Sequence, residues 1–134
     1  MKDKLFELLN NAYAPYSGYK VASAVVMNDG NIFLGINVEN ASYGATICAE
    51  RVAIDNAIVN GYKKNDFKAL YLVNNSNKVS YPCFICRQVI SEFFPLDAEV
   101  IIITTDKEEK VKVSDLIPFP FTEDDLSWKL DLLD

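Results

Sequence analysis

The spacing of apolar and polar residues divides the chain into helical and extended segments. Residues 2–13 place apolar side chains at helical spacing, which predicts an amphipathic N-terminal helix. Residues 21–28 and 31–39 are rich in strand-forming residues, and Asn28-Asp29-Gly30 between them is typical of a hairpin turn. We therefore expect these two runs to pair as antiparallel strands.

Further along the chain, helical spacing alternates with continuous apolar runs. Residues 48–61 repeat apolar positions at helical spacing and stop at Gly61, a residue type that often follows a helix C-cap. Residues 68–75 and 98–105 are predicted to be buried strands, and residues 83–94 between them a helix that Pro95 ends. A strand, a helix and a second strand form a βαβ unit, so part of the sheet should be parallel.

The C-terminal part of the chain predicts shorter elements. Residues 110–113 suit a short edge strand, and residues 114–130 contain prolines followed by a helix that Thr122 would cap. No repeat, linker or low-complexity segment divides the 134 residues. We expect a single domain, residues 1–134, of the α/β class, in which helices cover a mixed, five-stranded sheet.

Composition and charge exclude some classes of protein. Half of the residues are hydrophobic, enough for a core, and no apolar run approaches the roughly 20 residues of a membrane span. The net charge of −6 disfavours binding to nucleic acid, whose affinity for proteins comes largely from neutralised phosphates. The N-terminus lacks a signal-peptide pattern and three cysteines cannot all pair, so the expected location is the cytoplasm.

All three cysteines lie at the starts of predicted helices. Cys48 opens one helix, while Cys83 and Cys86 share a face, at i and i+3, in the first turn of the next. Pro82 precedes them and fits the first helical position, where its missing N–H has no consequence. Helix starts stabilise thiolates, and the thiolate is the form of cysteine that binds metal.

Charged residues accompany the cysteines in the same short segments. The chain has only two arginines, Arg51 and Arg87, and Glu50 lies beside the first of them. Three thiolates on Zn²⁺ leave an excess charge of about −1, which helix starts and a guanidinium can offset. Because the chain has no histidine and no fourth cysteine, we expect water in the fourth position and Glu50 to handle its protons. These features favour a catalytic zinc site.

Other interpretations of these residues stay open at this point. A C-x-x-C pair alone is also typical of buried core cysteines or of a redox motif. Glu50 alone is more often a solvated first-turn residue, and Arg51 alone a surface charge. A binding or structural module, in which zinc only joins two helix starts, is another alternative, and it would require a fourth protein ligand.

The combined motifs resemble those of zinc-dependent nucleobase deaminases. C-A-E at residues 48–50, followed by P-C-x-x-C at residues 82–86, matches their general signature. Along nearly its whole length the sequence also resembles the small homotetrameric cytidine deaminases of pyrimidine salvage. The matching blocks are APYSGYKVASA, NVENASYGATICAERVA, YPCFICRQVISEF and DLIPFPFTEDDL. This resemblance implies a three-layer α-β-α cytidine deaminase-like fold.

The resemblance implies a role for each residue of the metal motifs. Cys48, Cys83 and Cys86 would hold one Zn²⁺ per subunit, and Arg51 would bridge the ligand sulfurs. Glu50 would take a proton from the zinc-bound water, pass it to N3 of the cytosine, and deliver a proton to the departing amine. Cytidine would thus give uridine and ammonia, and deoxycytidine would give deoxyuridine and ammonia.

The resemblance also implies contacts with a small-molecule nucleoside. The backbone N–H of Ala49 would hold O2 of the base, and the carbonyl of Tyr81 would face the amino group. Asn37 and Glu39 would bind the 3′-hydroxyl of the ribose. We expect neither nucleic acid nor a membrane as a partner.

Several aromatic positions bear on assembly and on departures from the family pattern. Tyr43 and Phe121 match positions that complete the site of a neighbouring subunit, which implies a homotetramer with shared active sites. Tyr19 stands where a phenylalanine usually stacks near the substrate, and it adds a hydroxyl that needs a partner. Phe84 and Ile85 replace the small residues usual inside the C-x-x-C.

One stretch of the sequence leaves the substrate open. Ala22 and Ser23 replace the more usual glycine and alanine, and here the chain resembles the blasticidin-S deaminases. Another cytosine nucleoside, such as blasticidin S, is therefore an alternative substrate. A deaminase of nucleic acids is disfavoured by the acidic charge and the absence of a basic stripe.

Overall fold

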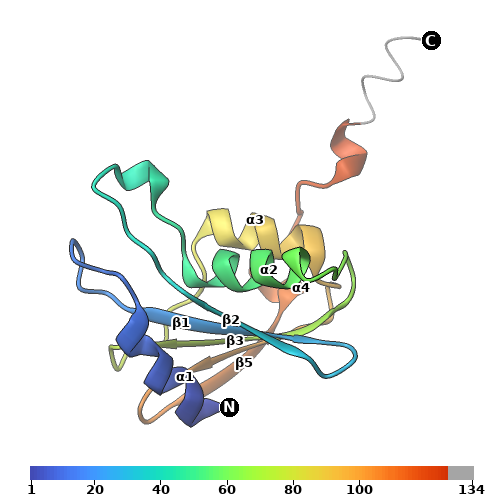
Figure 1. Cartoon of the computed structure of the whole chain (residues 1–134). Coiled ribbons are helices and arrows are strands. Elements are labelled where there is room, and N and C mark those ends of the chain that lie inside the picture. Colours follow the sequence, from blue (N-terminus) through green and yellow to red (C-terminus); the bar gives the residue numbers. More distant parts are fainter. Residues whose placement is uncertain (127–134) are drawn as a thin grey trace.

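The computed structural model describes residues 1–126, in which a five-stranded mixed sheet has helices on both faces (Figure 1). The strand order is β2-β1-β3-β4-β5; β3 and β4 are parallel and all other neighbours are antiparallel. The strands are β1 (Val21–Met27), β2 (Ile32–Ile36), β3 (Phe67–Asn74), β4 (Glu99–Ile103) and β5 (Glu108–Lys112). The predicted mixed sheet with five strands and a parallel βαβ unit is confirmed.

The helices form the two outer layers. On one face of the sheet lie α1 (Lys2–Leu8) and the 3₁₀ turn η1 (Leu9–Asn11); on the other lie α2 (Ala49–Val59), α3 (Phe84–Phe93) and α4 (Val113–Leu116) (Figure 1). Two more 3₁₀ turns are η2 (Tyr43–Ala45) and η3 (Glu123–Leu126). This is the expected three-layer arrangement, to which the structure adds the short α4. Within residues 1–126 no helix is both long and apolar enough to cross a membrane.

The central strands are buried on both faces, so the core has two parts. Ala22 and Ala24 of β1 pack with Leu5 of α1, whereas Val25 and Met27 pack on the side of α2 and α3. This explains why β1 is a nearly continuous apolar run rather than a strict alternation of apolar and polar residues.

The turn signals in the sequence form the structures they predict. β1 and β2 pair antiparallel, and Gly30 in the turn between them has a φ of +90°. At the end of α2, Gly61 has a φ of +97° and donates its N–H to the Ile58 carbonyl, while Tyr62 donates to the Ala57 carbonyl. This pair of bonds is a Schellman motif, which requires a left-handed residue at the position of Gly61.

A close approach between β2 and α2 fixes the height of α2 above the sheet. A Cβ atom on Gly35 of β2 would lie 2.3 Å from the Ala49 carbonyl oxygen and 2.5 Å from the Ala53 nitrogen. Only glycine lets the backbone of α2 lie this close to the strand. The residue that precedes α2 is Cys48, so this contact also sets the position of its sulfur.

Two local predictions differ from the structure. Helix α3 begins at Phe84 with Cys83 as its N-cap, so Pro82 precedes the N-cap and is not the first helical residue. The reason is the extended backbone of Cys83, which starts the helix two residues after the proline. The helix expected after Thr122 begins as the 3₁₀ turn η3, and the rest of that prediction, residues 127–130, lies outside the described residues.

Candidate active site

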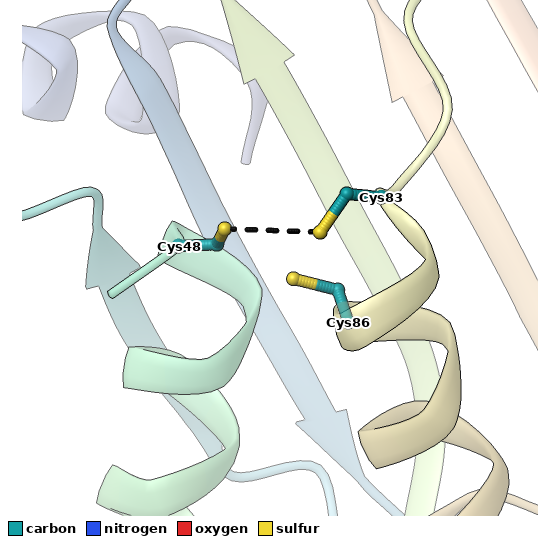
Figure 2. Close-up of side chains that lie close together, drawn as sticks. All are labelled: Cys48, Cys83 and Cys86. Atoms are coloured by element: carbon teal, nitrogen blue, oxygen red, sulfur yellow. Dashed lines mark hydrogen bonds between the residues drawn. The ribbon is translucent and has the colours of Figure 1, made fainter. Parts of the chain in front are cut away.

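The three cysteine sulfurs converge at the starts of α2 and α3, as Figure 2 shows. Cys48 is the N-cap of α2, Cys83 is the N-cap of α3, and Cys86 lies in the first turn of α3. All three Sγ atoms lie within 4.8 Å of one another, and the Cys48 and Cys83 sulfurs are 4.0 Å apart. Three sulfurs held tetrahedrally on zinc at 2.3 Å would be about 3.8 Å apart. The cluster therefore fits Zn²⁺.

The surroundings of Cys48 favour its thiolate form. A hydrogen bond with Cys86 lowers the pKa of Cys48 to about 5, and the Arg51 guanidinium contributes in the same direction. The same contact, together with burial, raises the pKa of Cys86. None of the three forms a disulfide, so all are free to act as ligands.

The Arg51 side chain lies against this cluster from α2. Its Nη2 donates to the Thr46 carbonyl at 3.2 Å and lies 4.0 Å from the Cys48 sulfur. The guanidinium is therefore placed to offset thiolate charge on Cys48.

Glu50 is the second residue of α2 and lies beside the sulfurs without joining them. Its side chain is 5% exposed, and its carboxylate does not belong to the group of possible ligand atoms that the three cysteines form within residues 1–126. Burial raises the pKa of Glu50 to about 7. At neutral pH this carboxyl group can therefore both accept and release a proton.

A cavity of about 420 Å³ opens above the cysteines, at the carboxyl end of β3. Ligands of α/β proteins commonly bind at this end of a parallel strand. The predicted site residues that line the cavity are Tyr19, Asn37, Glu39, Cys48, Ala49, Glu50, Tyr81 and Cys83. One cavity is thus lined by sulfur atoms of the cysteine cluster and by the buried carboxyl group of Glu50. Most of the residues predicted to contact a substrate line it as well.

Asn37 follows β2 and holds the start of β1. Its Oδ1 accepts the Val21 N–H at 3.0 Å, and its Nδ2 donates to the Tyr19 carbonyl at 2.7 Å. The Asn37 amide therefore holds the backbone of residues 19–21 in place, and Tyr19 in this segment lines the cavity.

Glu39 organises the neighbouring loop. Its carboxylate accepts the N–H groups of Tyr16, at 2.9 Å, and Ser17, at 3.1 Å, and also the Ser17 hydroxyl. The hydroxyl bond is the largest cause that lowers the pKa of Glu39, so the carboxylate stays ionised. The sequence analysis did not single out Ser17, which also lines the cavity.

Comparisons with known proteins identify the family of this site. Residues 1–104 match the family model described as the cytidine and deoxycytidylate deaminase zinc-binding region. The chain belongs to this deaminase family. The family's zinc-binding character and the geometry of the three cysteines agree on Zn²⁺ as the cofactor.

Individual members of the deaminase family are similar over most of the chain. A cytidine deaminase of Halalkalibacterium halodurans is 39% identical over 117 residues, 87% of each chain. The crystal structure of cytidine deaminase from Burkholderia pseudomallei superposes with a TM-score of 0.84 at 39% identity, covering 89% of this chain and 94% of that one. A blasticidin-S deaminase of Bacillus cereus is 32% identical over 112 residues, 78% of each chain. The predicted resemblance and fold class are confirmed.

Tyr81 lies at the edge of the deaminase cavity and is anchored from outside. Its hydroxyl donates to the Glu109 carboxylate of β5, and this bond raises the pKa of Tyr81. The Tyr81 hydroxyl therefore forms its hydrogen bond outside the cavity. The backbone of Tyr81 is the part that a substrate can contact.

Tyr43 and Phe121 do not line this chain's own cavity. Their side chains are 76% and 58% exposed, and the segments that carry them project from the body of the molecule (Figure 1). Tyr43 makes an edge contact with Tyr16, with ring centroids 6.1 Å apart. Both side chains thus lie on exposed projections, outside the cavity of their own chain.

The cavity also contains residues that the sequence analysis missed. They form part of its wall, and they come from four separate segments of the chain. They are Ser17, Val21, Thr46, Leu72, Val73, Asn74, Ser80 and Pro82. The sheet order and the loop paths bring them together, and the sequence analysis gave none of them a contact with a substrate.

Proposed function

We propose that this chain is a zinc-dependent hydrolase that deaminates cytidine and deoxycytidine to uridine or deoxyuridine and ammonia, as part of pyrimidine salvage. One observation carries the proposal: a three-cysteine cluster and a buried carboxyl group, that of Glu50, meet at one cavity. The names of the similar proteins support cytidine as the substrate.

The metal would be held by Cys48, Cys83 and Cys86, one ion per chain. When bound, Zn²⁺ supplies Lewis acidity that makes water reactive near neutral pH. Arg51 and the two helix starts offset the charge of the thiolates.

Glu50 is the proton carrier of the proposed reaction. Its carboxylate takes a proton from the attacking water and passes it to N3 of the cytosine. It then takes the proton of the hydroxyl group added at C4 and delivers it to the amino group, which leaves as ammonia while C4 becomes a carbonyl. A pKa of about 7 suits a group that must work in both directions at neutral pH.

Backbone groups orient the base. Ala49 is the first residue of α2, so its N–H has no acceptor within the helix and can donate to O2 of the base. The Tyr81 carbonyl accepts from the amino group, and the Tyr19 ring forms an apolar wall. All three residues line the cavity.

Asn37 and Glu39 bind the sugar in this proposal. Glu39 is ionised and can accept the proton of a 3′-hydroxyl, and Asn37 has a second amide hydrogen to donate to the same oxygen. A test is the substitution Glu39→Ala, which should reduce kcat/KM for cytidine and change little for free cytosine, which has no ribose.

A second candidate substrate is a larger cytosine nucleoside such as blasticidin S. Another cavity, of about 380 Å³, shares Ser17, Glu39 and Thr46 with the first and is lined further by Tyr16 and Tyr43. This space would accommodate a substituent that extends beyond the sugar.

We further propose that residues 1–134 form a single domain that assembles into a homotetramer with shared active sites and works in the cytoplasm. The exposed positions of Tyr43 and Phe121 support the shared sites. Three free thiols are typical of a reducing compartment and so support the cytoplasm.

The decisive experiment incubates purified protein with cytidine, deoxycytidine, cytosine and blasticidin S and follows loss of the amine. Metal analysis of the same sample should give about one zinc per chain. Rapid deamination of cytidine supports the main proposal, and faster turnover of blasticidin S replaces it with the second candidate. Absence of zinc or of any deamination refutes both.

A further inference from the structure

The two helices that carry the cysteines begin in an unusual way. In both α2 and α3 the N-cap residue is a cysteine whose side chain makes no capping hydrogen bond, because its sulfur turns toward the cluster. A helix start normally gains stability and a fixed entry angle from the side chain of its N-cap residue. Both starts therefore need another means of fixing the chain that enters the helix.

An arginine contacts the entering chain at both starts, with the same spacing. Arg51 donates to the carbonyl of Thr46, five residues before it, and Arg87 donates through Nε to the carbonyl of Pro82, also five residues before it, at 2.7 Å. These are the only two arginines of the chain. Arg51 also approaches the Cys48 sulfur, whereas the side-chain hydrogen bonds that Arg87 makes within residues 1–126 go to backbone carbonyls.

The Arg87 guanidinium is held on three sides. Besides Pro82, it donates through Nη1 to the carbonyl of Leu116, the last residue of α4, at 3.1 Å. It also lies over the Phe84 ring, 4.4 Å from the ring centre. In addition, the Arg87 backbone N–H donates to the Cys83 carbonyl at 2.9 Å. One residue thus fixes the two successive carbonyls at the start of the metal-binding turn and ties them to α4.

We propose that Arg87 is a positioning residue for the zinc site: it holds the turn from Pro82 to Cys86 so that the sulfurs of Cys83 and Cys86 stay directed at Cys48. The inference rests on the zinc site of the proposed function. Pro82 has no N–H and Cys83 offers no cap, so the guanidinium supplies the fixed contact to this turn. Its planar fork bonds two carbonyls in different directions, which the single ammonium of a lysine cannot reproduce.

The test compares zinc retention in the holoenzyme and in three variants, R87K, R87M and, as a matched control, Q88A. Gln88 is the next residue of α3, and its side chain also bonds a carbonyl of the C-terminal segment, that of Phe121, at 2.9 Å. The control thus removes a similar tie without touching the metal-binding turn. Zinc release is timed by transfer to a coloured chelator, and each protein is also loaded with Co²⁺ to record its thiolate absorption bands.

We expect R87M to release zinc about 10-fold faster than the unaltered protein, since changes just outside a metal site commonly cost 10–100-fold in metal affinity. R87K should release zinc severalfold faster, and both should shift the Co²⁺ bands, while Q88A changes neither. If R87M does not fold, R87K carries the test. Arginine variants with a lower Tm but zinc release and Co²⁺ bands like those of Q88A would overturn the inference and leave only a structural role.

Failure of this inference can be distinguished from failure of the proposed function. An unaltered protein that holds zinc and deaminates cytidine, with arginine variants that release zinc at the control rate, refutes the positioning role alone. An unaltered protein that holds no zinc refutes both.

Discussion

At the scale of single residues, burial and hydrogen bonding give two carboxyl groups opposite properties. Glu50 is buried and its pKa is raised to about 7, whereas Glu39 accepts hydrogen bonds at the surface and its pKa is lowered. The first can exchange protons near neutral pH, and the second remains a fixed negative charge. Residues of the same chemical class can thus serve proton transfer and substrate binding in one cavity.

The role of Glu50 predicts the effect of Glu50→Gln. The amide keeps the size of the side chain and is not a metal ligand, so zinc content should stay near one per chain. Loss of the proton carrier should lower kcat for cytidine by roughly 10²–10⁴-fold or more. Asp55→Asn, an exposed change on the same helix, is the control. Activity of Glu50→Gln within a few-fold of the control would exclude the proposed role.

The environment of Glu39 predicts a pH effect. Its lowered pKa means that the bonds holding residues 16 and 17 are complete above the usual pKa of a glutamate and are lost as the pH falls through the lowered value. Ser17→Ala removes the hydroxyl hydrogen bond, which is the largest cause of the lowered pKa of Glu39, so the pKa should rise toward its usual range. Carboxyl NMR titration measures this, with Asp29 as an internal reference in a separate turn. An unchanged Glu39 titration would show that the Ser17 hydroxyl is not its main partner.

The sequence predicts some site residues well and others not at all. The three cysteines and Glu50 could be singled out because they lie in two short motifs at predicted helix starts, and the resemblance to the deaminases assigned their roles. Ser17 could not, because it lies 22 residues from Glu39 and meets it only where a loop folds over the cavity. The contact from Arg87 to Leu116 spans 29 residues and depends on α4, a four-residue helix too short for a periodic pattern.

At the scale of elements, the site depends on how two helix starts are brought together above the sheet. The sequence predicts both helices and the strands β3 and β4, since each has strong periodicity or a long apolar run. It does not predict how closely α2 approaches β2. A glycine such as Gly35 within a strand indicates that another backbone segment can lie close to the strand, but not which segment or how close. That distance places Cys48 and Glu50 relative to α3.

This close approach predicts that Gly35→Ala damages both stability and the site. The added methyl group would overlap the backbone of α2, which must shift away from β2. Overpacking of this kind typically costs about 1–3 kcal/mol, and the shift should also loosen zinc binding. Denaturant unfolding and metal analysis measure the two effects. Gly44→Ala, which adds a methyl group where no atom lies within 4 Å, should leave both nearly unchanged. Equal stability of the two variants would contradict this account of α2.

At the scale of the whole molecule, several large aromatic side chains are exposed to solvent. Tyr43, Phe84 and Phe119 are 76%, 78% and 100% exposed, and Phe121 is also exposed. Large exposed apolar groups that occur together commonly mark an interface. In the proposed homotetramer, Tyr43 and Phe121 would complete a neighbour's cavity.

Mixing of inactive variants tests this shared site. Glu50→Gln should inactivate the subunit that holds the proton carrier, and Phe121→Ala the neighbouring cavity that the aromatic ring completes. When the two variants are unfolded together and reassembled with zinc, some cavities combine an intact Glu50 from one chain with an intact Phe121 from the other. Activity should then exceed the sum of the separate variants, and sedimentation should show tetramers.

The control for this experiment pairs Glu50→Gln with Cys83→Ala. Both altered residues line the cavity of a single chain, so no exchange of subunits can restore a complete site, and activity should stay low. Recovery in the first mixture but not in the second means that cavities are built from two chains. Recovery in neither mixture, or an active monomer in sedimentation, would mean that the cavities are not shared between chains and that the exposed aromatic residues have another purpose.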